Sequence, residues 1–216
     1  MKTRFVAKVC AVASIVASTV LIPTAVATAA PCSDVEIAYA RGTGEFPGLG
    51  ITGGPFASSV TSQLPGRSVS TYAVNYAASY GQTSAGPGSR DLVARVTSVA
   101  AACPDTEFIL GGYSQGATVV SNAIGLRTPS SFTGAVLPAD VASRVKAVVV
   151  FGNPLGLTRQ TIESASATYG SRARSFCNFG DPVCQLGGFN SFAHLTYATN
   201  GSTTQGATFA ASMIGT

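Results

Sequence analysis

The pentapeptide Gly112-Tyr113-Ser114-Gln115-Gly116 carries a residue type suited to covalent chemistry, because it matches the pattern G-x-S-x-G. The apolar residues 108–110 before it predict a strand, and the small, mostly apolar residues 117–120 after it predict a helix. A sharp turn between the two would hold the serine in a strained, exposed elbow. The free N–H groups of the following helix would face any anion formed there. The sequence therefore predicts Ser114 as a nucleophile.

His194 is the only histidine in the chain. A serine hydroxyl is a weak nucleophile at neutral pH and needs an adjacent base. A lone histidine is commonly a surface or packing residue, but His194 follows the last predicted strand in a chain that also has a candidate nucleophile. We therefore predict His194 as the base.

A carboxylate is needed to orient the imidazole and to stabilise its charged form. The acidic residues between Ser114 and His194 are Asp140, Glu163 and Asp181. Asp140 suits the start of a helix, and Glu163 suits the solvated side of a polar helical stretch. Asp181 directly follows the last predicted strand, at the edge where α/β sheets place catalytic groups. We predict Asp181 as the third member, with an ordinary Asp-Pro turn as the alternative.

The anion of an acyl-transfer intermediate also needs hydrogen-bond donors. The backbone N–H of Gln115, one residue past the serine, is the expected first donor. No HGGG-type motif offers a second, but Arg41-Gly42-Thr43-Gly44-Glu45 follows the first predicted strand at the same edge. We predict the Thr43 N–H, with its hydroxyl, as the second donor; a plain glycine-rich turn is the alternative.

Short, nearly continuous apolar runs alternate with helical patterns, which predicts a parallel sheet covered on both faces. The expected fold is a three-layer α/β/α sandwich with strand order 2-1-3-4-5. The predicted strands are residues 35–40, 69–76, 107–113, 146–151 and 174–179. The predicted helices are residues 115–126, residues 140–145, and a helix through Leu92, Val96 and Val99 capped by Ser89; the glycine-rich residues 81–88 are expected to form a loop.

Residues 1–29 have the layout of a secretory signal peptide, with a basic head, an apolar run over residues 9–22 and small residues before the expected cleavage at Ala30. Pro23 argues against the alternative, a retained membrane anchor. The remaining 187 residues, 30–216, suit one domain. We therefore expect a secreted protein, released or held at the cell envelope.

Charge gives no reason to expect nucleic acid as a partner. The chain has 13 basic and 9 acidic residues, and three of the basic ones lie in the leader. The mature chain would therefore carry a net charge of about +1. We expect a monomer with no stable membrane span that acts on an ester substrate.

Four cysteines remain once Cys10 is removed with the leader, which allows three disulfide connectivities. Cys177 and Cys184 lie seven residues apart and favour a local loop, which would leave Cys32 with Cys103. In the expected strand order, Cys32 and Cys103 stand just before neighbouring strands. With no CxxC motif and one histidine, the sequence predicts no metal site.

Together, these motifs resemble the cutinase family of serine esterases. The matching segments are residues 41–45, 112–116 and 180–184 (Gly-Asp-Pro-Val-Cys), with His194 and the four mature cysteines. The resemblance spans essentially the whole mature chain. It implies Ser114 as nucleophile, His194 as base, Asp181 as orienting carboxylate, and Thr43 with Gln115 as the oxyanion hole.

The resemblance also implies a five-stranded parallel sheet of the α/β-hydrolase fold, disulfides Cys32–Cys103 and Cys177–Cys184, and no cofactor. Members act on carboxylic esters, commonly of short to medium acyl chains, and some take polyester, triglyceride or phospholipid. The leader and composition resemble actinobacterial, including mycobacterial, members.

The residues that would bind the acyl chain are not marked by a motif. Apolar residues near the motifs are candidates for an acyl site, or equally for packing: Leu49, Ile51, Leu186, Phe189 and Phe192. An acetylxylan esterase, a thioesterase or a phospholipase A of the same fold is an alternative function. A peptidase or a non-catalytic secreted binding protein is a more distant one.

Overall fold

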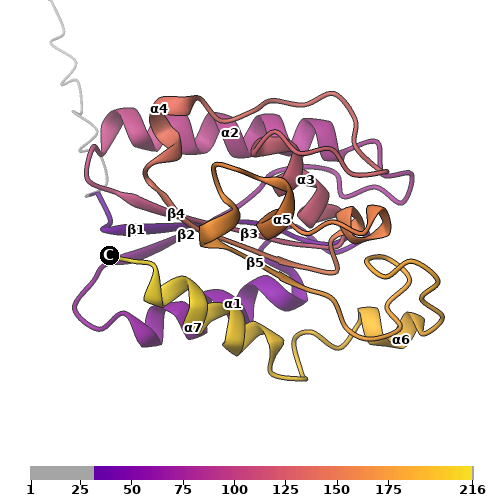
Figure 1. The fold of residues 1–216 in the computed structure, drawn as a ribbon. Helices are drawn as coiled ribbons and strands as arrows, with labels where there is room; N and C mark the ends of the chain where they lie inside the picture. The colour runs from indigo at the N-terminus through magenta and orange to yellow at the C-terminus, as the bar shows by residue number, and fades with distance from the viewer. Residues whose placement is uncertain (1–31, 216) are drawn as a thin grey trace, which may run out of the picture. The chain divides into compact units, whose positions relative to one another are not determined.

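A five-stranded parallel sheet in the order β2-β1-β3-β4-β5 forms the centre of the computed structural model, which describes residues 32–215 (Figure 1). Its strands are β1 (Val35–Ala40), β2 (Val69–Ala73), β3 (Glu107–Tyr113), β4 (Val145–Phe151) and β5 (Ala173–Phe176). Every neighbouring pair is parallel. The predicted fold class and strand order are confirmed. The predicted leader, residues 1–29, lies outside the described residues.

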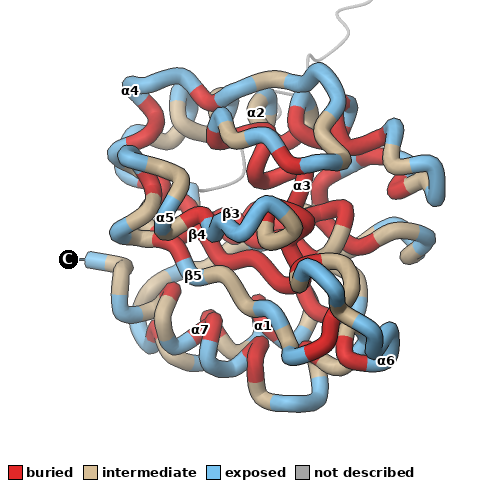
Figure 2. Tube along the Cα trace, turned by 45° about the vertical axis from the view of Figure 1, so that its right-hand side comes forward, coloured by how far each residue is buried: buried red, intermediate tan, exposed pale blue. Residues whose placement is uncertain are grey.

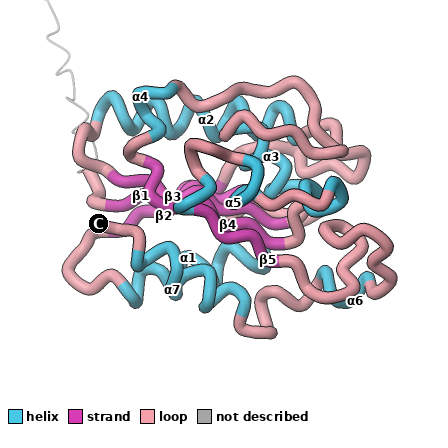
Figure 3. The backbone as a smooth tube through the Cα atoms, viewed as in Figure 1, coloured by secondary structure: helices cyan, strands magenta, loops and turns pink. Residues whose placement is uncertain are grey.

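Helices cover both faces of the sheet, so the fold has three layers (Figures 1 and 3). One face carries α2 (Ala85–Ala102), α3 (Gln115–Ala123), α4 (Ala139–Ala142) and α5 (Ile162–Ala165). The other carries α1 (Gly50–Gln63) and α7 (Ser202–Ser212), while α6 (Ser191–His194) lies beyond the end of the sheet. Short 3-10 helices, η1 (Pro154–Thr158) and η2 (Gly170–Arg172), stand between β4 and β5. No helix of residues 32–215 is long and apolar enough to cross a bilayer.

The central strands are apolar on both sides because both sides are covered. In β1, Ala38 and Ala40 face the core beneath α2 and α3, whereas Ile37 and Tyr39 face the core over α1 and α7. All four are fully buried. Figure 2 shows this buried centre between half-exposed outer helices. Continuous burial explains why the strand is apolar apart from Glu36, which is itself buried.

Both predicted disulfides are present. Cys32 and Cys103, with Cα atoms 5.6 Å apart, join the chain just before β1 to the end of α2, ahead of β3. Closing a loop of this length contributes roughly 4 kcal/mol by restricting the unfolded chain. Cys177 and Cys184, with Cα atoms 5.8 Å apart, close a short loop that contains Asp181. The second bridge therefore restrains a candidate site residue.

The expected loop over residues 81–88 ends at Ser84, and the expected cap at Ser89 is wrong. Helix α2 begins at Ala85, so Ser89 lies inside it, donating to the Gly86 carbonyl oxygen (2.9 Å). Its hydroxyl also accepts from the N–H of Ala135 (3.1 Å). A Cβ at Gly86 would overlap the Thr133 carbonyl oxygen. Gly86 therefore allows close packing of the helix against this segment.

Several predicted elements end earlier than expected. Strand β2 stops at Ala73 instead of residue 76, and β5 stops at Phe176, where the disulfide loop begins. Helix α3 stops at Ala123 because Gly125 takes a left-handed conformation, with φ +82°. The helix expected over residues 140–145 is a single turn, because β4 begins at Val145.

Candidate active site

Ser114 stands at the turn between β3 and α3 in a strained backbone conformation, with φ +56° and ψ −118°. A Cβ on Gly116 would overlap the carbonyl oxygen of Ala40, and a Cβ on Gly112 would overlap that of Gly116. The two glycines of the motif therefore let the start of α3 press against the end of β1. This contact forces the sharp turn that carries the serine.

Asp181 and His194 form a hydrogen-bonded pair beside this turn. Nδ1 of His194 lies 2.8 Å from Oδ2 of Asp181, whose side chain is fully buried. The N–H of Val183 donates to the other carboxylate oxygen (2.8 Å), and the hydroxyl of Tyr197 donates to Oδ2 (2.5 Å). Each oxygen of the buried carboxylate is thus hydrogen-bonded.

The pKa of Asp181 is lowered from its ordinary value. Burial alone would raise it, but the hydrogen bonds from His194, Tyr197 and the Val183 N–H together outweigh burial. The carboxylate is therefore ionised at neutral pH. A buried anion in contact with Nδ1 fixes the imidazole so that Nε2 is free to take a proton.

The imidazole of His194 is held on its other sides by Tyr113 and Gly152. The Tyr113 ring stacks on it with centroids 4.9 Å apart, and the Tyr113 hydroxyl donates to the His194 carbonyl oxygen (2.8 Å). Gly152 follows β4 with φ +59°, and its bare Cα leaves the room that the ring fills. The N–H of Ser114 donates to the carbonyl oxygen of Phe151 (2.9 Å), directly before this glycine. The serine and the histidine therefore flank the same end of β4.

Within residues 32–215, no hydrogen bond joins the Ser114 hydroxyl to His194 or to another side chain. Such bonds are often long in ligand-free enzymes and tighten when substrate binds. The arrangement brings the three predicted residues to one edge, with the Asp–His contact formed and the Ser–His contact open.

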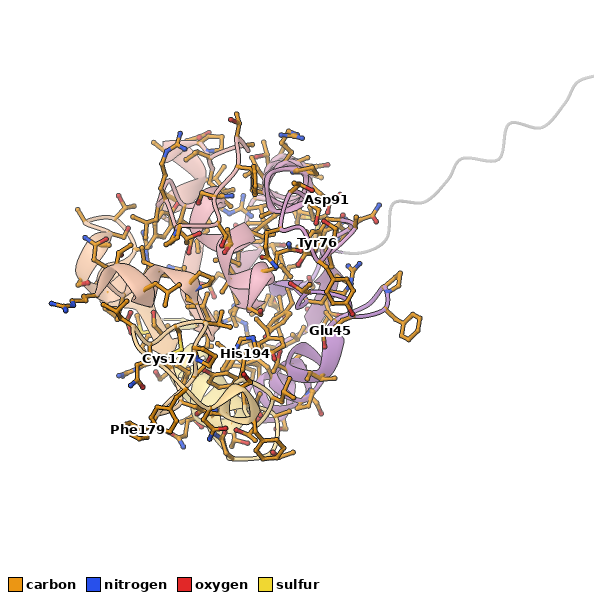
Figure 4. All side chains as sticks on the ribbon, turned by 90° about the vertical axis from the view of Figure 1, so that its right-hand side faces the viewer. Glu45, Tyr76, Asp91, Cys177, Phe179 and His194 are labelled. Carbon is orange, nitrogen blue, oxygen red and sulfur yellow. A yellow bond between two sulfur atoms is a disulfide. The ribbon has the colours of Figure 1, made fainter. Side chains whose placement is uncertain are left out.

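The loop after β1 is fixed by its own charged residues. Arg41, which is buried, donates to the Glu45 carbonyl oxygen (2.8 Å) and to that of Tyr76 (2.6 Å). The Glu45 carboxylate accepts from the N–H groups of Gly42 and Ile51. Figure 4 looks onto this edge of the sheet, with His194 between Glu45 and Cys177. The charged residues of the motif thus shape the loop that carries Thr43.

Gln82, which the sequence analysis missed, tethers Thr43 from the side. Its Nε2 donates to the Thr43 hydroxyl (2.9 Å), and its own backbone is strained, with φ +61°. The buried side chain of Gln115 holds the loop that carries Gln82. It donates to the Ser79 carbonyl oxygen (2.9 Å) and accepts from the Ser84 hydroxyl (3.2 Å). Gln82 gave no signal in the sequence because it lies in a polar, glycine-rich stretch.

A pocket of about 280 Å³ opens at Ser114. One part of its lining is polar and the other is apolar, and the lining comes from five separate segments. Its residues are Gln82, Ser114, Ser130, Pro154, Leu157, Pro182 and Val183. None of the five residues predicted for the acyl site lines this pocket. They were chosen because they lie near the motifs in the sequence, whereas the fold brings the lining side chains together from distant segments.

Four of those five residues are exposed around the site. Leu49 instead packs, half-buried, against the core beside α1. The exposed ones belong to a larger group that we call the apolar rim: Phe46, Ile51, Tyr80, Phe179, Leu186, Phe189, Phe192 and Leu195, each at least 50% exposed. Phe179 and Phe189 stack edge to face with centroids 6.2 Å apart, and Figure 4 shows Phe179 projecting outward. Exposed aromatic side chains in such number are typical of a surface that meets an apolar partner.

Of the three acidic candidates, only Asp181 contacts His194. Asp140 lies in the first turn of α4, as expected. Glu163 is not solvated as expected, because it is half-buried and accepts from the Ser175 N–H and the Ser175 hydroxyl, both at 2.7 Å. It supports β5 at Ser175.

The parallel sheet, the serine at a strand–helix turn and the buried Asp–His pair define the class of α/β-hydrolases. Residues 31–214 match the family model described as Cutinase. The chain belongs to the cutinase family. This resemblance was predicted from the motifs, and it is confirmed.

Similar proteins carry the names of carboxylic ester hydrolases. A protein of Kineococcus radiotolerans named Cutinase is 56% identical over 187 residues, which cover 86% of this chain and 63% of that protein. The Probable carboxylesterase Culp3 of Mycobacterium tuberculosis is 43% identical over 86% of this chain and 71% of its own length. A Trichoderma reesei cutinase in complex with a C11Y4 phosphonate inhibitor superposes with a TM-score of 0.66 at 28% identity, covering 86% of this chain and 78% of that one.

The chain thus spans just under two thirds of the Kineococcus protein and more of the other two. These names and the family model place it in a family of carboxylic ester hydrolases.

Proposed function

We propose that this protein is a secreted serine esterase that hydrolyses carboxylic esters through an acyl-enzyme on Ser114. One observation carries the proposal: the 2.8 Å contact between His194 Nδ1 and the buried, ionised Asp181, beside a serine in a strained turn. A buried carboxylate held against an imidazole is what a serine nucleophile needs.

The proposed reaction proceeds in two halves. The Ser114 hydroxyl oxygen attacks the ester carbonyl carbon while Nε2 of His194 takes the hydroxyl proton. The C–O bond to the alcohol then breaks, and His194 returns the proton to the leaving alcohol. Water, deprotonated by His194, attacks the acyl carbon; the bond to the Ser114 oxygen then breaks, His194 returns the proton to that oxygen, and the acid leaves. Asp181 holds the imidazole and stabilises its charged form throughout.

The negative oxygen of each tetrahedral intermediate would be bound by the N–H groups of Gln115 and Thr43. Two features support this role. Gln115 begins α3, where N–H groups lack helical partners. Gln82 donates to the Thr43 hydroxyl, and the bonds of Arg41 and Glu45 fix the loop that carries Thr43. Donors held before substrate arrives need not reorganise during the reaction.

The substrate class follows from the pocket and the apolar rim. The segment over residues 177–203 contains no lysine or arginine, and its one carboxylate, Asp181, is buried. An uncharged rim favours a neutral ester presented at an apolar surface, such as a polyester or lipid-like ester. The 280 Å³ pocket suits short to medium acyl chains. Ile51, Leu186, Phe189 and Phe192 are proposed to contact the substrate, and Leu49 to support them from beneath.

The substrate class is tested by hydrolysis of p-nitrophenyl esters from acetate to palmitate, together with acetylated xylan, an acyl thioester and a phospholipid. We expect the rate to peak at short or medium acyl chains. Deacetylation of xylan that greatly exceeded hydrolysis of butyrate would identify an acetylxylan esterase instead. A preference for the thioester or the phospholipid would identify a thioesterase or a phospholipase A, and activity on none would favour a binding protein.

Secretion and a monomeric state belong to the same proposal. Two disulfides in a chain of this size suit an oxidising compartment. The leader predicted for residues 1–29 would direct export. Detection of the mature chain, beginning at Ala30, in the culture medium or the envelope fraction tests export. Light scattering of the purified protein tests the monomer.

A further inference from the structure

Tyr197 is buried beneath the candidate site, three residues after His194. Its side chain is fully buried in the core on the α1 and α7 side of the sheet. The ring packs at an angle against Phe151 (centroids 5.9 Å apart) and edge-on to Tyr113 (6.0 Å) and His194 (6.2 Å). These contacts fix the ring, so the position of its hydroxyl is fixed as well.

The Tyr197 hydroxyl bridges the two segments that carry Asp181 and His194. It accepts a hydrogen bond from the N–H of Asn178 (3.0 Å) and donates one to Oδ2 of Asp181 (2.5 Å). The side chain of Asn178 reaches across in the same direction and donates to the Ala193 carbonyl oxygen (2.7 Å). The loop after β5 and the turn around α6 are therefore joined at the hydroxyl of Tyr197.

Oδ2 of Asp181 consequently receives two donors, the Tyr197 hydroxyl and His194 Nδ1. A carboxylate that shares its charge with a second donor is a weaker acceptor for each. The shared atom also fixes the rotation of the carboxylate, with Val183 N–H holding the other oxygen. One hydroxyl thus affects both where the carboxylate lies and how strongly it attracts the imidazolium.

We propose that Tyr197 is a positioning residue of the esterase, which holds Asp181 Oδ2 against His194 and moderates the hold of that carboxylate on the protonated imidazole. The inference rests on the proposed function of the Asp181–His194 pair. It assigns to Tyr197 an effect on the basicity of the His194 imidazole as well as on the position of the Asp181 carboxylate.

The other groups around the pair do not supply this effect. Tyr113, from β3, stacks on the imidazole and donates to the backbone of His194 instead of to Asp181. Burial raises the pKa of both tyrosines, with the charges of Glu45 and Asp181 adding to the effect on Tyr113 and the hydrogen bond to Asp181 adding to that on Tyr197. Both phenols stay neutral, so Tyr197 remains a donor over the working range of pH. The Cys184 sulfur, 3.5 Å from the Tyr197 hydroxyl, is held in a disulfide.

The test compares Tyr197→Phe with Tyr39→Phe. Tyr39 is an equally buried tyrosine of the same core whose hydroxyl bonds Thr52 (2.8 Å), away from the pair. Each variant loses one buried phenol hydroxyl, so losses of stability should be similar in kind. Rates on soluble p-nitrophenyl butyrate are measured from pH 4 to 9, and the single histidine is titrated by NMR.

For Tyr197→Phe we expect kcat to fall roughly tenfold at its optimum with KM little changed. The acidic limb of kcat/KM and the histidine titration should both move to higher pH, by about 0.5 to 1 unit, because the carboxylate holds the imidazolium more tightly. Tyr39→Phe should leave kcat and both midpoints at the wild-type values.

The inference is overturned if both midpoints of Tyr197→Phe stay at the wild-type values. It is also overturned if Tyr197→Phe fails to fold while Tyr39→Phe folds, because the residue would then be a structural support. Activity that survives in Ser114→Ala would instead overturn the proposed function, so the two failures are distinguishable.

Discussion

The imidazole of His194 lies directly against the backbone of Gly152, where a Cβ would stand 2.7 Å from Cε1 and 2.9 Å from Nδ1 of the ring. Gly152 also has φ +59°, a conformation that side chains rarely adopt. The first residue after β4 is therefore part of the surface that places the imidazole of His194. A glycine is required there for two separate reasons.

Gly152→Ala should displace the imidazole and lower kcat at least tenfold, an effect of the size seen when a catalytic group is misplaced by about 1 Å. Gly66→Ala is the matched control, because Gly66 has φ +84° but no atom within 4 Å of its Cβ position. Both variants should lose roughly 1 kcal/mol of stability to backbone strain, but only the first should lose activity. Equal activities of the two would show that Gly152 does not position His194.

Gln82→Ala should weaken the oxyanion site, because Thr43 loses the only side-chain donor to its hydroxyl within residues 32–215. We expect kcat to fall roughly tenfold with KM nearly unchanged, since the bonds to the oxyanion form in the transition state. Gln63→Ala removes a glutamine bonded only to Ser59, on α1, and should leave the kinetics unchanged. A rise in KM alone would mean that Gln82 contacts substrate instead.

Phe189→Ser tests the apolar rim. Phe189 is 78% exposed, so its loss should cost little stability. Hydrolysis of an emulsified triglyceride should fall several-fold because less apolar area is buried on the surface, while hydrolysis of soluble p-nitrophenyl acetate stays the same. Val136→Ser removes another exposed apolar side chain (58% exposed), near the far end of α3, and should change neither rate. A parallel fall on both substrates would place Phe189 in the active site itself.

The pH dependence of stability should reveal the ionised state of Asp181. Its pKa is lowered in the folded protein, because hydrogen bonds outweigh burial. The carboxylate therefore contributes stability above its unfolded pKa of about 3.9, and that contribution is lost as the pH falls through the folded pKa. In urea unfolding, the stability of the wild type relative to Asp181→Asn should decrease as the pH is lowered from about 5.

Glu163→Gln is the comparison variant for this measurement. The pKa of Glu163 is also lowered, because hydrogen bonds from Ser175 outweigh burial. The difference in unfolding free energy between the wild type and Glu163→Gln should therefore depend on pH with the same sign. Glu163→Gln should keep wild-type turnover, whereas Asp181→Asn should lose on the order of 10³ to 10⁴ in kcat. Parallel stability curves for the wild type and Asp181→Asn would contradict the assigned ionisation.

The buried strands and the short disulfide loop could be predicted from the sequence because their signals are local. The run from Val35 to Ala40 is apolar except for Glu36, and the structure gives it the predicted bounds. The spacing of Cys177 and Cys184 led to the observed bridge. By contrast, α1 and α7 were not predicted, since both are rich in glycine, serine and threonine, and α1 contains Pro55. Packing against each other and the sheet, not helix propensity, stabilises them.

The site was predictable only where a motif marked it. Ser114, Asp181 and His194 were predicted from their places after strands, and the structure brings the three to one edge of the sheet. Tyr197, Gly152 and Gln82 act through contacts between segments far apart in the chain, which no local pattern encodes. The pocket lining was missed for the same reason.

The central claim is that Ser114 is the nucleophile, and turnover of p-nitrophenyl butyrate by Ser114→Ala tests it most directly. Ser130→Ala is the matched control, because Ser130 lines the same pocket. We expect Ser114→Ala to stay folded and to lose a factor on the order of 10³ or more in kcat, with Ser130→Ala close to the wild type. Substantial activity in folded Ser114→Ala would contradict the account and would mean that another group attacks the ester.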